Sequence, residues 1–259
     1  MSFYQKLRWL IQMGIEETIC EFPVNRLKPK EKITVTDKTT TTDISRSSSA
    51  TTPADTLVQQ AVGVASQAQT LADLAKAMQS FHASTLKRTA ANTVFAAGNP
   101  QADIMIIGDM PEASDDLSGI PFSAEPGELL KKMMAAIGLS CDTHCYTSVL
   151  IPWRAPGGRK PTSAEIAQCL PFIKRHIELA NPKVLVLFGA LTSGALLGID
   201  SLSRARGIWH PYQSEKLPSP IPTLVTFSPA YLIKNPAHKK HAWEDLKRLQ
   251  TKISESESA

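Results

Sequence analysis

The stretch KVLVLFGALTSGALLG, residues 183–198, has the pattern of a buried strand that is followed directly by a short helix. Its first part, KVLVLFG, is an almost continuous aliphatic run, which is typical of a strand covered on both faces. The part that follows favours a helix, and Gly198 ends it. Such a strand predicts a parallel sheet that lies between two layers of helices.

Three other segments have the same character as this strand. They are ADIMIIGD at 102–109, CYTSVLI at 145–151 and IPTLVTF at 221–227. Helical patterns lie between and around the strands, at 56–80, 127–139, 163–180 and 241–253. Thr162 and Glu165 form a capping box at the start of the third helix. The alternation predicts a three-layer α/β/α fold with a central four-stranded parallel sheet.

The N-terminal part of the chain differs in composition. Residues 1–26 contain apolar side chains at helical spacing and predict an amphipathic helix, which either docks on the core or binds a partner. Residues 27–55 are dominated by Ser, Thr and charge, so we expect a disordered linker before a folded domain over 56–259. The sequence shows neither a secretory signal pattern nor an apolar run of membrane-spanning length, which favours a cytoplasmic protein without a membrane partner.

The composition permits a nucleic-acid partner and argues against a disulfide framework and a metal site. The 259 residues are 42% hydrophobic and carry a formal net charge of +4, a balance that permits a nucleic-acid partner. Four cysteines are too few and too scattered for a disulfide framework. The cluster Cys141, His144 and Cys145 has no second ligand pair at zinc-like spacing, so we predict no metal site.

Ligands of an open α/β sheet bind beyond the carboxyl ends of its strands. Four segments occupy this position: GDMPEASDDLSGIPF at 108–122, PWRAPGGRKP at 152–161, GALTSG at 189–194 and SPAYLIKNP at 228–236. Together they hold acids, an aromatic ring, basic side chains and an apolar run between prolines. Basic side chains bind phosphates, and apolar side chains wedge between base steps. Acids at the centre indicate chemistry on a base that has left the duplex.

These motifs resemble the uracil-DNA glycosylase superfamily, and its family 4 type most. The resemblance covers about residues 91–249 and rests on GDMPEASDDLSGIPF, PWRAPGGRKPTSAEIAQCLPF, KVLVLFGALTSGALLG, RARGIWH and TFSPAYLIKNP, in that order. It implies base flipping and hydrolysis of an N-glycosidic bond in DNA. It also implies a protein of the nucleoid, which we expect to act as a monomer.

The resemblance assigns roles to residues at the strand ends. Asp109 is the candidate catalytic acid, although its carboxylate could instead stabilise the loop by a hydrogen bond. Asp115 or Asp116 could act in the reaction or cap the following turn. Phe122 matches the aromatic ring that stacks on the base, the alternative being a plug under the loop. Gly108, Ser148 and Val149 complete the base-binding set.

The remaining assignments concern DNA. The loop at 228–236 matches the one that the family inserts into the duplex, so Tyr231, Leu232 and Ile233 would fill the space of the flipped nucleotide, beside Lys234. The basic residues Arg154, Arg159 and Lys160 either hold phosphates or are solvated surface charges.

Three departures from the family pattern are visible. The four cysteines that hold the iron–sulfur cluster of the family 4 type correspond to Phe81, Ser84, Trp153 and Cys169. One thiol cannot hold such a cluster, so we predict that it is absent and that no other cofactor replaces it.

The other two departures lie in the base site. An asparagine that recognises uracil corresponds to Val149, which has no side-chain donor, unless the alignment slips and restores Ser148 to the pocket. The histidine that begins the last loop corresponds to Ser228, whose hydroxyl is a weaker donor to the departing base. Losing such a donor costs about 2.7–4 kcal/mol of transition-state stabilisation.

Three functions are compatible with this pattern. The first is a DNA glycosylase that removes uracil or another deaminated base, such as hypoxanthine. The second is a non-catalytic DNA-binding member of the same fold. The third, a hydrolase of a free nucleoside, fits poorly because such a substrate needs no wedge loop, and no GxSxG nucleophile motif is present.

Overall fold

A computed structural model of the protein describes residues 53–257. The helix predicted at 1–26 and most of the linker predicted at 27–55 lie outside the described residues, whereas residues 53–55 already belong to a helix. The described chain forms one six-stranded sheet with the order β1-β3-β2-β4-β6-β5. Its strands are β1 (Ala96–Gly98), β2 (Ile104–Gly108), β3 (Cys145–Val149), β4 (Val184–Phe188), β5 (Trp209–Tyr212) and β6 (Ile221–Thr226).

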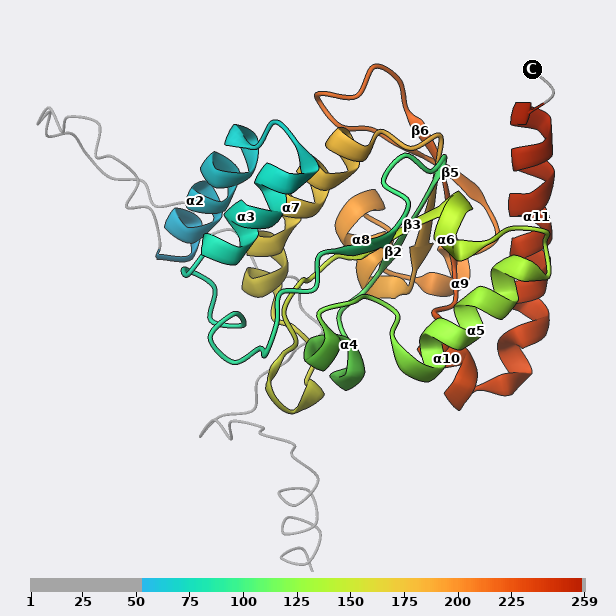
Figure 1. The fold of residues 1–259 in the computed structure, drawn as a ribbon, viewed down its shortest axis with the longest axis horizontal. Coiled ribbons are helices and arrows are strands. Elements are labelled where there is room, and N and C mark those ends of the chain that lie inside the picture. The colour runs from blue at the N-terminus through green and yellow to red at the C-terminus, as the bar shows by residue number, and fades with distance from the viewer. Residues whose placement is uncertain (1–52, 258–259) are drawn as a thin grey trace, which may run out of the picture. The chain divides into compact units, whose positions relative to one another are not determined.

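Helices cover both faces of this sheet (Figure 1). They are α2 (Pro53–Gln67), α3 (Leu71–Ser80), α4 (Ala113–Ser118), α5 (Ala124–Ala135), α6 (Cys141–His144), α7 (Ser163–Ala180), α8 (Ala190–Leu197), α9 (Leu202–Ala205), α10 (Pro229–Lys234) and α11 (Lys239–Glu257). Two short 3₁₀ turns, η1 (Pro156–Gly158) and η2 (Pro236–His238), complete the described elements.

The predicted three-layer fold is confirmed. The four central strands, β3, β2, β4 and β6, pair in parallel. Alternate side chains of β2 enter opposite cores: Met105 packs in the cluster that includes side chains of α2, α3 and α7, whereas Ile106 packs with those of α5 and α11. Every residue of β2, β3 and β4 is buried, which explains why these strands are apolar without alternation.

The sheet is larger than the sequence predicts. Strands β1 and β5 extend it at its two edges, and both pair antiparallel to their neighbours. Neither strand has a buried apolar run: β1 is the three-residue segment AAG, and β5 contains Pro211. Proline is tolerated in an edge strand because one side of that strand has no ladder partner.

Two helical predictions need correction. The single helix expected over 56–80 is divided into α2 and α3, because Thr70 caps α3 through a capping box with Asp73. The segment expected as a loop at 228–236 contains the helix α10, which Ser228 caps and which begins at Pro229. Proline suits the first helical position because its missing N–H needs no partner there. The capping box of Thr162 and Glu165 on α7 is confirmed.

No helix within residues 53–257 combines the length and the apolar character that crossing a membrane requires.

Candidate functional site at the strand ends

The carboxyl ends of the central strands lie at one level of the sheet. Gly108 at the end of β2 is in register with Val149 of β3 and with Phe188 of β4, and Phe188 is in register with Thr226 of β6. The helices α4 and α10 and the segment from β3 to α7 lie along this edge of the molecule (Figure 1). The structure therefore brings the predicted strand-end segments together.

Phe122 forms an aromatic platform at this edge. A Cβ atom on Gly108 would lie 2.8 Å from Phe122 Cζ and 3.6 Å from Val149 Cγ1, so only glycine allows the ring to approach the strand end so closely. On β4, Phe188 meets the ring edge-on, with the centroids 5.8 Å apart. Phe122 is half-buried, which leaves part of it accessible to a ligand. The predicted cluster of Gly108, Phe122 and Val149 is thus assembled.

The backbone that carries this ring adopts an unusual conformation. Phe122 has φ +54° and Ala124 has φ +52°, in the left-handed region that costs a residue with a side chain about 1–2 kcal/mol. Gly127 packs against the turn, because a Cβ atom there would lie 1.9 Å from the carbonyl oxygen of Phe122. The surrounding contacts hold a conformation that the local sequence does not favour.

The carboxylate of Asp115 holds the turn around Phe122 by hydrogen bonds. It is 4% exposed, and its Oδ1 accepts hydrogen bonds from both the backbone N and the Oγ of Ser123, each at 2.6 Å. Its Oδ2 accepts from the backbone N of Glu112 at 3.0 Å, which caps α4. Of the two roles considered for Asp115, the geometry supports the cap of the turn, because both carboxylate oxygens are occupied in positioning Phe122.

Asp109 lies at the end of β2 and points to the N-terminus of α8. Its Oδ1 accepts hydrogen bonds from the backbone N of Thr192 at 2.8 Å and from the Thr192 hydroxyl. Gly189, with φ +116°, leaves room for the carboxylate, because a Cβ atom there would lie 2.2 Å from Asp109 Oδ2. Burial raises the pKa of Asp109, while the hydrogen bonds from Thr192 oppose that rise. The carboxylate is held rigidly beside the strand end.

The structure places Val149 and Ser148 on opposite faces of β3. Val149 packs near Gly108, whereas Ser148 Oγ donates to the carbonyl oxygen of Phe95 at 2.7 Å and lies 3.4 Å from His176 Nδ1. The base-binding assignment of Ser148 is therefore wrong, because successive side chains of a strand point to opposite faces. His176, which the sequence did not single out, is buried there and also contacts the Tyr146 hydroxyl at 2.9 Å.

The residues that the sequence predicts to enter DNA lie on helix α10. Leu232 is 1% exposed and belongs to the core on the α5 and α11 side. Its assignment to direct DNA contact is wrong for this conformation, because the amphipathic helix turns Leu232 inward. Tyr231 is 37% exposed, and its ring stacks on Phe227 at 5.2 Å and on His238 at 5.4 Å. Ile233 is half-buried and Lys234 is exposed.

Ser228 begins this helix. Its Oγ accepts a hydrogen bond from the backbone N of Tyr231 at 3.2 Å, and the residue is half-buried. Because the oxygen acts as acceptor in this cap, the hydroxyl proton stays available for a second partner.

The basic residues at this edge are not equivalent. Arg159 donates to both carboxylate oxygens of Glu165, at 2.6 and 2.9 Å, and its charge is already paired. This contact lowers the pKa of Glu165 to about 2. Arg154 is half-buried and packs over Gly158, whereas Lys160 is exposed. Arg159 is therefore the weakest of the predicted phosphate ligands.

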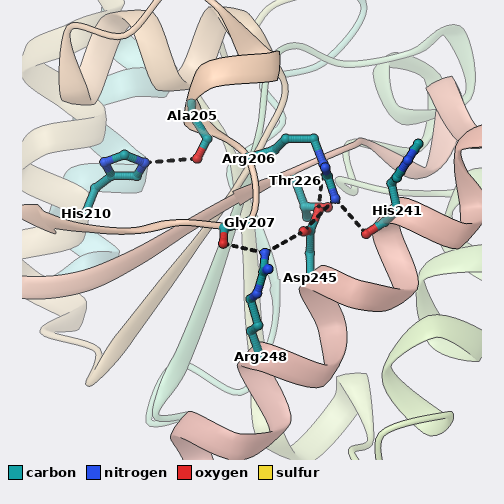
Figure 2. Close-up of polar contacts among 8 residues, drawn as sticks. All are labelled: Ala205, Arg206, Gly207, His210, Thr226, His241, Asp245 and Arg248. Atoms are coloured by element: carbon teal, nitrogen blue, oxygen red, sulfur yellow. Dashed lines mark hydrogen bonds and ion pairs between the residues drawn. The ribbon is translucent and has the colours of Figure 1, made fainter.

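A clamp that the sequence did not reveal fixes the end of β6 (Figure 2). Asp245 of α11 is fully buried and accepts from Thr226 Oγ1 at 2.7 Å and from Arg206 Nη2 at 2.8 Å. Arg206 also lies over the Phe227 ring, 5.5 Å from its centroid, and Arg248 donates to the carbonyl oxygen of Gly207. The strand end that leads into Ser228 is thereby held against α11.

The positions that correspond to cluster ligands form a packed core. The rings of Phe81 and Trp153 stack with their centroids 6.3 Å apart, and Phe172 meets Phe81 edge-on at 5.1 Å. Cys169 is fully buried, and burial raises the pKa of its thiol. Ser84 is buried as well. These side chains do not offer the four thiolates that an iron–sulfur cluster requires.

No group of three or more His, Cys, Asp or Glu side chains suited to a metal ion occurs among residues 53–257. In the segment that contains Cys141, His144 and Cys145, the Nδ1 of His144 accepts a hydrogen bond from Ser140 N at 3.0 Å.

The fold and the strand-end site define a three-layer α/β protein in which an aromatic ring, Phe122, and a buried acid, Asp109, lie at the carboxyl end of β2. The chain belongs to the uracil DNA glycosylase superfamily, whose family profile matches residues 95–247.

Several curated relatives are similar over most of their own length. The Type-4 uracil-DNA glycosylase of Archaeoglobus fulgidus is 28% identical over 186 residues, which cover 70% of this chain and 92% of that protein. The one of Saccharolobus solfataricus is 31% identical over 172 residues, covering 63% and 77%. The one of Thermotoga maritima is 29% identical over 170 residues, covering 65% and 85%.

Proposed function

We propose that this protein is a DNA glycosylase that removes uracil or another deaminated base after the nucleotide has left the duplex. The observation that carries the proposal is the Phe122 ring, which lies against Gly108 and Val149 at the strand ends. A half-buried aromatic face at that position offers a flipped base a stacking partner. Membership of the superfamily and the names of the relatives support the same reaction class.

The reaction breaks the bond between the base and C1′ of the sugar, and the oxygen of a water molecule adds to C1′ while the proton that the water loses ends on the departing base. Positive charge develops on the sugar and negative charge on the base. Asp109 would stabilise the sugar cation through its fixed charge and orient the water. It acts electrostatically in this proposal, because Oδ1 already accepts two hydrogen bonds from Thr192. Asp115 has no chemical step in this proposal and positions Phe122.

Ser228 is the proposed donor to the departing base. Its hydroxyl proton is available while its oxygen caps α10, and a hydrogen bond to the base oxygen would stabilise the developing anion. Val149 contributes an apolar contact and no hydrogen bond to the base edge. A site with fewer polar contacts discriminates less between bases, so we propose that deaminated purines are substrates beside uracil.

The proposed DNA contacts are the exposed or half-buried residues of this edge. Lys160, Lys234 and Arg154 would hold phosphates, and Tyr231 would touch the DNA beside them. We propose that no iron–sulfur cluster is present, because the aromatic core of Phe81 and Trp153 occupies that region. The protein would act as a monomer on chromosomal DNA in the cytoplasm.

The test uses single-stranded and duplex oligonucleotides that carry uracil, hypoxanthine or xanthine, followed by alkali to cleave abasic sites. Strand scission that is lost in Asp109→Asn supports the enzyme. Asp103→Asn is the matched control, because its carboxylate is 62% exposed and, within residues 53–257, its ion pair is with Lys183 at the surface. Binding without scission on every base would support the alternative of a non-catalytic DNA-binding protein.

A further inference from the structure

The segment between β6 and α10 carries two residues to which the proposed function assigns a role. Ser228, the proposed donor, lies two residues beyond the end of β6 at Thr226, and Tyr231 lies in the first turn of α10. Beside them, the ring of Phe227 stacks on Tyr231 with an angle of 9° between the planes. Helix α10 has six residues, and a helix that short is not stable by itself. The positions of Ser228 and Tyr231 therefore depend on the contacts that hold Phe227 and the end of β6.

Arg206 holds the Phe227 ring. Its guanidinium carbon lies 5.5 Å from the ring centroid, a distance at which a cation attracts the face of an aromatic ring. The arginine is fixed in turn, because its Nη2 donates to the carbonyl oxygen of His241 at 2.9 Å and to Asp245 Oδ1 at 2.8 Å. Its backbone forms a parallel bridge with Val225 of β6. Arg206 therefore lies beside β6 and contacts the residue that follows the strand.

A single carboxylate joins this arginine to the strand (Figure 2). Asp245 Oδ1 accepts from Arg206 Nη2, and Asp245 Oδ2 accepts from Thr226 Oγ1 at 2.7 Å and from Arg206 Nε at 3.3 Å. Asp245 has an exposed fraction of 0% and Thr226 of 1%, so water does not compete for these bonds. Through this carboxylate, helix α11 holds Thr226 directly and Phe227 by way of Arg206. These are the two residues that precede Ser228.

The turn after Arg206 leaves room only for a glycine beside this carboxylate. A Cβ atom on Gly207, which has φ +68°, would lie 2.7 Å from Asp245 Oδ1 and 2.2 Å from Arg248 Nη1. Burial raises the pKa of Asp245, and the hydrogen bond from Thr226 and the charge of Arg206 oppose that rise. A buried ion pair often contributes no more net stability than apolar side chains of the same size. The charged arrangement differs in its fixed geometry, because an arginine that binds both carboxylate oxygens tolerates few orientations.

We propose that Asp245 is a positioning residue of the reaction and that it fixes the backbone that carries Ser228. It acts through Thr226 and Arg206, because a fully buried side chain cannot contact DNA itself. This inference rests on the proposed function, in which the Ser228 hydroxyl donates to the departing base, and adds to it a residue of the last helix. Without the charge of Asp245, the end of β6 and the Phe227 ring can shift, and a displaced donor stabilises the departing base less.

The test measures single-turnover excision of uracil from a single-stranded oligonucleotide, with rates expressed per folded molecule. We expect Asp245→Asn to lower the maximal rate at least about tenfold and to change the protein concentration at half-maximal rate less than about threefold, because the bond to the departing base strengthens only in the transition state. Glu178→Gln is the matched control and should keep the maximal rate. This carboxylate is 10% exposed and also accepts from an arginine and a hydroxyl, those of Arg175 and Ser214. It lies on the last turn of α7, which leads into the start of β4, at the opposite end of the strands.

Two variants of Thr226 keep the test decisive if Asp245→Asn does not fold. Thr226→Val removes the hydroxyl that binds Asp245 Oδ2 and should lower the maximal rate at least about threefold. Thr226→Ser keeps a hydroxyl at this position, so it should lose much less of the rate than Thr226→Val does. Equal losses in the two variants would show that the bond to Asp245 is not what positions Ser228.

Amide hydrogen exchange separates this inference from the proposed function. The backbone N of Tyr231 donates to Ser228 Oγ at the start of α10. The amides of α10 should exchange faster in Asp245→Asn and Thr226→Val than in the wild type, and at the wild-type rate in Glu178→Gln. If the wild type excises no base, the proposed function fails, but the fixing of α10 by Asp245 stands if this difference in exchange is seen. An unchanged maximal rate in Asp245→Asn, or unchanged exchange in α10, would overturn the inference.

Discussion

Replacing Asp115 by alanine tests whether this carboxylate positions Phe122 or takes part in the chemistry. The change removes the hydrogen bonds from Ser123 N, Ser123 Oγ and Glu112 N. At about 1 kcal/mol of net stability each, they contribute about 3 kcal/mol. Without these bonds Phe122 can leave its left-handed backbone conformation, and this relief offsets about 1–2 kcal/mol of the loss. We therefore expect the free energy of unfolding to fall by about 1–2 kcal/mol, with the Phe122 turn relaxed.

Two assays measure this effect. Urea unfolding, followed by tryptophan fluorescence, gives the free energy of unfolding, and single-turnover excision gives the rate per folded molecule. Because a relaxed turn moves the platform, the rate should fall at least about tenfold even where all molecules are folded. Ser123→Ala should show a smaller loss in both assays, since it removes only the Oγ bond. Asp103→Asn serves as the control at an exposed carboxylate.

One result would refute the positioning role. If Asp115→Ala leaves the free energy of unfolding within about 0.5 kcal/mol of the wild type while excision is lost, the carboxylate acts on the substrate itself. In that case Ser123→Ala would leave the excision rate unchanged, because a chemical role does not depend on the turn.

Burial lowers the pKa of His176 to about 3 from an ordinary 6.5, so its neutral ring stabilises the fold fully above pH 6.5 and progressively less as the pH falls toward 3. When the pH is lowered from 6.5 to 5, the free energy of unfolding of the His176→Gln variant should fall by about 2 kcal/mol less than that of the wild type, as measured by urea unfolding at both pH values. Equal falls in the two proteins would contradict the lowered pKa of His176. Gly127→Ala should lower the free energy of unfolding by more than about 2 kcal/mol, because the added Cβ would lie 1.9 Å from the carbonyl oxygen of Phe122. Gly63→Ala is the control and should raise the free energy of unfolding, because a Cβ there has no atom within 4 Å and alanine favours the helix more than glycine does. Ser84 Oγ is buried and has no hydrogen-bond partner among the described residues, so thermal unfolding of Ser84→Ala should show equal or higher stability, by up to about 1 kcal/mol, and a clear loss would reveal a partner for this hydroxyl.

The strand-end site shows which contacts can be predicted from the sequence and which cannot. Phe122, Gly108 and Val149 were predicted as one cluster, and the structure brings them together. Their meeting follows from parallel strands whose carboxyl ends lie at one edge. The direction of Ser148 was left open, since a shift of one position in the alignment exchanges the two faces of a strand.

The role of Asp115 could not be decided from spacing alone. Its main partner, Ser123, is eight residues away and belongs to the next turn. The clamp of Asp245 on Thr226 and Arg206 joins residues that lie 19 and 39 positions apart. The sequence contains no local signal for such contacts, because only the packing of α11 against the sheet brings the groups within hydrogen-bonding distance.

Local patterns determined the class of fold. Continuous apolar runs specify strands that are covered on both sides, and capping residues such as Thr162 mark where a helix begins, because these preferences act between near neighbours. Tertiary packing decided the edge strands, the inward side of α10 and the left-handed turn at Phe122. In each of these cases a segment of weak local preference takes the conformation that its distant neighbours stabilise, so its own sequence does not predict it.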